Sequence, residues 1–175
     1  MSNLLYKLTN YLPCRIISDD GQHYLERYYL FTILGVRFYL HRFVGSDPAR
    51  GLHDHPWPWA GSVILSGWYT EETRQGLRAI RWFNWIKGDS FHRVILPHDI
   101  RAMSFAPDNP ITDCCWTLFF HRAKYTKPWG FLRKIDYETT HIWIPHNYQG
   151  DGTGTPDAWW ETVPMGKDEP RRMAL

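Results

Sequence analysis

The chain has 175 residues, the size of one domain with a sizeable core, and 43% of them are hydrophobic. Lysine plus arginine (20) nearly balance aspartate plus glutamate (18), so global charge gives no support for a nucleic-acid or membrane partner. Three cysteines without a CxxC pair indicate reduced thiols, and no signal peptide or apolar run of ~20 residues is found, so we expect a soluble cytoplasmic protein.

Residues 1–23 are predicted to form an N-terminal extension, with one short helix over residues 3–12. Between residues 24 and 148, runs rich in aromatic and β-branched residues alternate with Gly, Pro, Asn and Asp turns, which is typical of short β-strands. The predicted strands are YLERYYLFTIL (24–34), VRFYLHRFV (36–44), WAGSVILSGWYTEE (59–72), LRAIRWFNWI (77–86), FHRVIL (91–96), AMSFA (102–106), CCWTLFFH (114–121) and THIWIP (140–145). Their spacing predicts an all-β sandwich or barrel.

Residues 149–175 are rich in glycine, proline and charge and show no period. We expect an irregular C-terminal tail, held to the domain by Trp159 and Trp160.

Two histidines flank a single aspartate in the stretch GLHDHPWPW (51–59). If this stretch is extended, His53 and His55 face the same side, about 6.5 Å apart along the chain. They can then converge on one cation, each at about 2 Å. Asp54 faces the other way, so we expect it to orient a loop and not to bind the ion. Pro56 lacks a backbone donor and suits a strand end.

A third histidine, His92, is the second residue of the predicted strand FHRVIL, which follows the turn at Gly88. One hairpin's length of chain separates it from His55, so an antiparallel fold can return it beside the first pair. The sequence therefore predicts a metal site made by His53, His55 and His92. His41, on a predicted inward strand face, is the reserve ligand, although a buried, hydrogen-bonded histidine is the simpler interpretation there.

These segments resemble the cupin superfamily. Gly51, His53, His55 and Gly67 follow the order of the first cupin motif, and Gly88 with His92 matches the second loosely. The resemblance covers roughly residues 24–145. Within the superfamily, the chain looks like cupin-like proteins that are common in phage and bacterial genomes. It implies a single jelly-roll barrel over residues 24–148, and a homodimer formed through an edge strand.

The chain departs from the cupin pattern at the glutamate ligand. Trp59 and Ala60 occupy its place, and Glu71 and Glu72 lie too far along the chain. The metal ligands are then three neutral imidazoles, which leave the charge of a divalent ion uncompensated and favour an anionic partner. Such a site also leaves positions for a bidentate substrate and dioxygen.

Within the cupins, the thiol dioxygenases are similar in using three histidines, and LHDHP and HRV look like their ligand segments. This resemblance implies that Arg27 holds a substrate carboxylate and that His121 is catalytic, although a surface arginine and a structural histidine are the simpler interpretations. It favours iron(II) and a small thiol- or carboxylate-bearing substrate. Trp57, Trp59 and Trp68 are expected to line an apolar pocket for it.

Two alternatives stay open. One is a cupin isomerase, lyase or hydrolase that uses zinc, manganese or nickel as a Lewis acid. The other is a non-enzymatic cupin that binds a sugar or nucleotide, in which the tryptophans matter more than the histidines.

Overall fold

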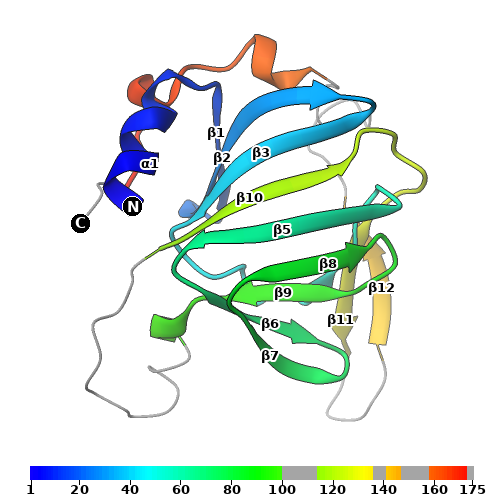
Figure 1. The fold of residues 1–175 in the computed structure, drawn as a ribbon. Coiled ribbons are helices and arrows are strands. Elements are labelled where there is room, and N and C mark those ends of the chain that lie inside the picture. Colours follow the sequence, from blue (N-terminus) through cyan, green and yellow to red (C-terminus); the bar gives the residue numbers. More distant parts are fainter. Residues whose placement is uncertain (100–113, 136–140, 147–157, 173–175) are drawn as a thin grey trace.

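The computed structural model describes residues 1–99, 114–135, 141–146 and 158–172. Two six-stranded antiparallel sheets make up most of this part of the chain (Figure 1). The predicted strand AMSFA lies outside the described residues. The longest helix in the described part, α1 (Ser2–Leu8), has seven residues and is far too short to cross a membrane.

The first sheet holds the longer strands. Its spatial order is β1 (Cys14–Asp19), β2 (Gln22–Ile33), β3 (Val36–Phe43), β10 (Cys115–Arg122), β5 (Trp59–Ser66) and β8 (Phe83–Lys87). Strand β10 is central and pairs with β3 on one side and β5 on the other. Its side chains alternate, so that Thr117, Phe119 and His121 are buried between the sheets.

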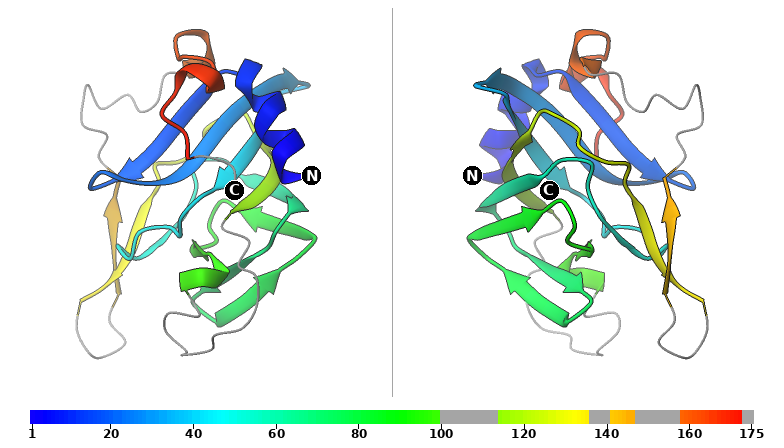
Figure 2. Two further views of the ribbon diagram at one scale, coloured as in Figure 1. Left: turned by 90° about the vertical axis from the view of Figure 1, so that its left-hand side faces the viewer. Right: turned by 90° about the vertical axis from the view of Figure 1, so that its right-hand side faces the viewer.

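The second sheet is built from shorter strands. Its order is β12 (His141–Pro145), β11 (Gly130–Lys134), β4 (Leu52–His53), β9 (His92–Ile95), β6 (Tyr69–Thr73) and β7 (Gly76–Ile80). The side views show the two sheets inclined to one another around a shared interior (Figure 2). No strand pairing joins the two sheets within the described residues, so the all-β prediction is confirmed as two antiparallel sheets, without closure into one barrel.

The two ends of the chain pack together on the outer side of the first sheet. Strand β1 lies within the segment expected as an N-terminal extension and forms the edge of this sheet. Helix α1 and the 3₁₀ helix η1 (Thr9–Tyr11) cover a cluster that includes Tyr28 and Trp116, both fully buried. From the C-terminal segment, the 3₁₀ helix η3 (Gly166–Asp168) contacts η1, and η2 (Trp159–Glu161) buries Trp159.

Candidate metal centre

Strand register brings two of the predicted histidines together. His53, the last residue of β4, is the direct antiparallel partner of His92, the first residue of β9. Directly opposed residues have Cβ atoms about 4.5–5.5 Å apart, so their side chains meet on one face. The imidazole centroids of His53 and His92 are 4.8 Å apart.

His55 reaches the same place from a loop and not from a strand. Strand β4 ends at His53, and β5 of the other sheet begins only at Trp59, so the stretch from His53 to His55 is not one continuous strand. Pro56 and Pro58 explain the break, because proline cannot donate a hydrogen bond to a strand partner. The loop is held by His55 N–H, which donates to the Gly88 carbonyl at 3.2 Å.

Gly88 is required by this close approach. A Cβ atom built on Gly88 would lie 2.0 Å from the Trp57 carbonyl oxygen. The glycine that precedes His92 in the sequence therefore lets the two histidine segments pack backbone to backbone.

The three imidazoles form a group suited to one ion. One ring nitrogen from each of His53, His55 and His92 lies within 4.8 Å of the others, and the Nε2 atoms of His55 and His92 are 2.8 Å apart. Two nitrogens bound at about 2.1 Å in adjacent octahedral positions would be about 3.0 Å apart. The nitrogens of His55 and His92 therefore have the spacing of two ligands of one divalent ion.

Desolvation keeps two of these ligands, His53 and His55, in the neutral form that metal binding needs. Desolvation lowers the pKa of His53 and His55 well below 6.5, and the neighbouring His92 adds to the effect. Unprotonated nitrogens are therefore present at neutral pH.

A carboxylate that the sequence reasoning dismissed stands behind His92. Glu71 is 2% exposed, and its Oε1 lies 2.7 Å from His92 Nδ1. Strand β6 pairs with β9, and this pairing places Glu71 beside His92 although Glu71 is distant from His55 in the sequence. Burial raises the pKa of Glu71, but hydrogen bonds from His92, Asn84 and Arg78 outweigh this and lower it to about 2. No linear motif spacing reveals this residue, because the strand pairing places it.

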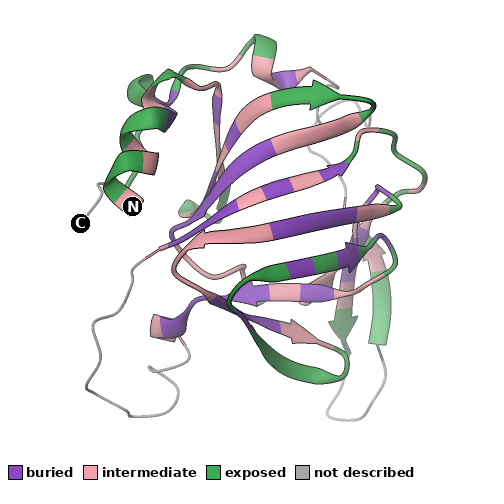
Figure 3. Ribbon diagram, viewed as in Figure 1, coloured by how far each residue is buried: buried purple, intermediate pink, exposed green. Residues whose placement is uncertain are grey.

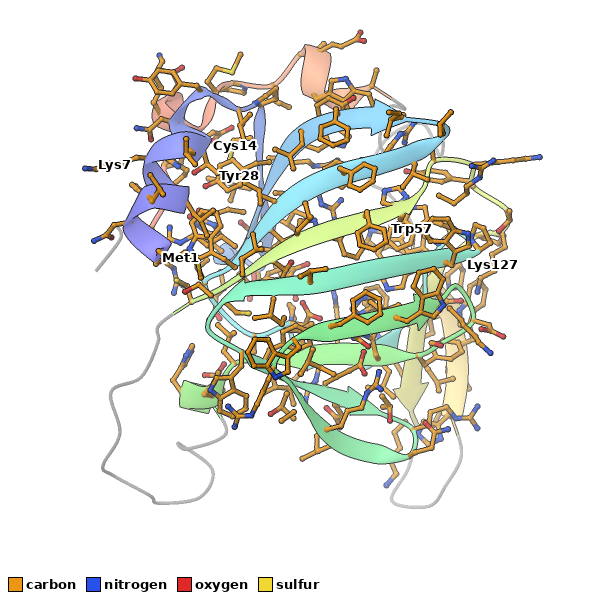
Figure 4. All side chains as sticks on the ribbon, viewed as in Figure 1. Met1, Lys7, Cys14, Tyr28, Trp57 and Lys127 are labelled. Carbon is orange, nitrogen blue, oxygen red and sulfur yellow. The ribbon has the colours of Figure 1, made fainter. Side chains whose placement is uncertain are left out.

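Asp54 faces away from the histidines and organises a neighbouring loop, as the alternation predicted. It is 2% exposed and accepts a hydrogen bond of 2.7 Å from Gly130 N–H. The ammonium of Lys127 binds its other oxygen. In Figure 4, Trp57 and Lys127 lie at the same end of the first sheet, where this loop meets the site.

The histidine group lines a cavity of about 380 Å³ between the sheets, and this cavity is strongly basic. Its imidazoles are His41, His53, His55, His92, His121 and His146, and its guanidinium groups are Arg15, Arg27, Arg37 and Arg50. Asp47 is the one carboxylate among the described lining residues. His146 is thus part of the cavity wall. A cavity with this excess of positive charge favours an anionic ligand.

Arg27 projects into the cavity from β2. Its Nε donates to Nε2 of His41 at 3.1 Å, and its guanidinium carbon lies 5.7 Å from the centre of the Tyr39 ring. Burial lowers the pKa of His41 well below 6.5, which keeps this nitrogen a lone-pair acceptor. Within the described residues Arg27 makes no ion pair, whereas Arg50 is paired with Asp19 at 2.6 Å.

Of the three tryptophans predicted to line the pocket, only Trp57 does so. It stacks between the rings of His55, at 4.3 Å, and His121, at 4.2 Å. Trp59 points to the outer face because residues alternate along β5, and it stacks on Trp85 instead. Trp68 lies outside the cavity too, under Arg81.

His121 is buried in the cavity wall at the end of β10. Its Nδ1 donates to the Arg122 carbonyl at 2.8 Å, which leaves Nε2 as the acceptor. Burial lowers the pKa of His121 to about 3.

No family model and no curated protein matches the sequence. Solved structures that are similar to it include a cupin 2 conserved barrel domain protein from Rhodopseudomonas palustris (13% identity, 70% of this chain and 77% of that chain, TM-score 0.49). The cupin-2 domain protein Rru_A2000 from Rhodospirillum rubrum is 16% identical over 66% of this chain and 72% of its own, with a TM-score of 0.46. A structure of FeII HppE is 8% identical over 63% of this chain and 56% of its own, with a TM-score of 0.46.

Proposed function

We propose that this chain is a metal-dependent enzyme of cupin jelly-roll type, and that it is an iron(II) dioxygenase acting on a small anionic molecule. The observation that carries the proposal is the group of three imidazoles, from His53, His55 and His92, at one wall of a basic cavity. Within the described residues this group consists of histidines alone, which supports the proposal of an all-histidine ligand set.

His53, His55 and His92 would hold the ion, and iron(II) bound there would supply the one-electron chemistry that activation of dioxygen requires. Arg27 binds the anionic end of the substrate through its terminal nitrogens, while His41 fixes its Nε. The buried rings of Trp57, Phe119 and Trp159 exclude water from the cavity. His121 offers Nε2 as a proton acceptor in the same wall.

Metal content and oxygen consumption test the proposal together. The protein is purified without an affinity tag, analysed for metals, and loaded with iron(II) under argon. Oxygen uptake is then measured with a panel of small thiols and carboxylates. We expect about one ion per chain, loss of that ion in His53→Ala, and retention in the control His141→Ala, whose side chain is exposed on β12.

Arg27→Gln is expected to keep the ion and to raise the KM for the substrate, because the lost guanidinium binds the substrate and not the metal. Stoichiometric metal without oxygen uptake for any compound would favour the isomerase, lyase or hydrolase alternative. A protein that binds no metal would refute the proposal and favour a non-enzymatic binding role.

A further inference from the structure

We infer that Glu71 is a positioning residue for the metal centre, and this inference rests on the proposed function. The carboxylate of Glu71 would thus not bind the ion itself but would act on it indirectly, through its hydrogen bond with His92. A histidine that binds a metal through one nitrogen commonly donates its other N–H to a carboxylate, which fixes the ring and raises its basicity.

The contacts of Glu71 fix its direction. Oε1 receives His92 Nδ1 and Asn84 Nδ2, each at 2.7 Å. Oε2 receives Arg78 Nε at 2.5 Å. Both Glu71 oxygens accept from groups that can only donate, Asn84 Nδ2 and Arg78 Nε, so the geometry assigns the donor role toward Oε1 to His92 Nδ1. Its Nε2 is then unprotonated and directed at His55 Nε2.

The neighbouring Glu72 provides a matched control. Glu72 pairs with Arg93 at 2.6 Å and points away from the cavity, since successive residues of a strand face opposite sides. It has the same charge, strand and sequence context as Glu71, but within the described residues it makes no hydrogen bond or ion pair with a histidine ligand.

The experiment titrates zinc(II) into metal-free wild type, Glu71→Gln and Glu72→Gln by competition calorimetry. We expect Glu71→Gln to bind zinc about 10- to 100-fold more weakly than wild type, and Glu72→Gln to match wild type. Equal affinities for wild type and Glu71→Gln would overturn the inference. Failure of wild type to bind zinc would instead refute the proposed function.

A second measurement needs no variant. Long-range ¹H–¹⁵N correlation spectra of the metal-free wild type report the tautomer of each imidazole. We expect His92 to be protonated on Nδ1 and bare on Nε2. The opposite tautomer would overturn the inference even if Glu71→Gln failed to fold.

An independent observation concerns the outer face of the first sheet, and here we propose that a second copy of this chain binds. A ladder of aromatic rings crosses five adjacent strands, away from the part that α1 covers. Its members, in order, are Phe31, Phe38, Phe120, Trp59, Trp85 and Phe83, with consecutive centroids 4.8, 5.6, 6.5, 5.1 and 6.5 Å apart.

Three rings of the ladder are about half exposed. Phe31 is 49% exposed, Phe83 51% and Trp85 48%, and the exposed Ile33 and Leu34 continue the patch at the β2–β3 turn. Figure 3 shows the alternation of buried and exposed residues along β8, the last strand of this sheet.

The area fits a dimer. With about 200 Å² for each large side chain, the three half-exposed rings together with the exposed Ile33 and Leu34 present about 600 Å² of apolar surface, the upper end of the range for the largest patch on a monomer. Two copies placed face to face would bury about 1,200 Å², which reaches the lower bound of specific, stable interfaces.

Sedimentation velocity at about 1–100 μM tests this second proposal. We expect wild type to sediment as a dimer of the 20.8 kDa chain, and Trp85→Lys and Phe31→Lys to sediment as monomers. Leu77→Lys, an exposed position on β7 of the other sheet, is the control and is expected to stay dimeric. A monomeric wild type at about 100 μM, or a dimeric Trp85→Lys, would overturn the proposal.

Discussion

Replacement of Asp54 by alanine should destabilise the protein without removing a metal ligand. The carboxylate satisfies the buried Gly130 N–H, and a buried donor left without a partner costs about 1–3 kcal/mol. The Lys127 side chain is 35% exposed, so its ion pair with Asp54 contributes at most about 1 kcal/mol. We therefore expect a loss of about 3 kcal/mol in the free energy of unfolding.

For a chain of 175 residues, this loss corresponds to a decrease in Tm of about 6–12 °C. Circular dichroism melts of the metal-free protein measure it, and metal analysis at 20 °C checks that the folded variant still binds the ion. Asp168→Ala is the control, because the exposed Asp168 carboxylate pairs with the adjacent Lys167 and with no other side chain among the described residues. A Tm within 1 °C of wild type, or loss of metal at an unchanged Tm, would show that the role assigned to Asp54 is wrong.

Trp159→Ala should lower the free energy of unfolding, measured by guanidinium denaturation, by about 3–5 kcal/mol, because the ring is 5% exposed and stacks on Tyr39 in the cavity wall. The control is Trp143→Ala, at an exposed position. A loss under about 1 kcal/mol for Trp159→Ala would contradict this prediction. His121→Phe should flatten the pH dependence of stability in the metal-free protein. The folded-state pKa of His121, about 3, is below the unfolded value of about 6.5, so its contribution is complete above pH 6.5 and is lost as the pH falls toward 3. Wild type should lose about 1.4 kcal/mol per pH unit more than His121→Phe between pH 6 and 4, and parallel stability profiles would refute this assignment.

The sequence predicted what depends on local pattern. Alternation predicted the β-rich fold, the inward His41 and the outward Asp54, and the two histidine segments predicted the group that the register of β4 and β9 assembles. Each of these follows from period-two geometry or from a short motif.

The sequence missed what depends on pairing between distant strands. Glu71 reaches His92 only because β6 lies beside β9, and no spacing along the chain encodes that neighbour. Trp59 was assigned to the pocket because it is close to His55 in sequence, yet two residues beyond Trp57 the chain has already entered a strand of the opposite sheet. For both Glu71 and Trp59, distance along the sequence did not predict distance from the histidine group.

The path of residues 54–58 has one mechanical consequence. These residues pass from the second sheet to the first, so His53 moves with one layer while His55 is attached to the start of the other. An ion bound by both histidines would link the two sheets, and its binding free energy would add to the free energy needed to separate them. Metal occupancy and the stability of the packing between the two sheets would then increase and decrease together.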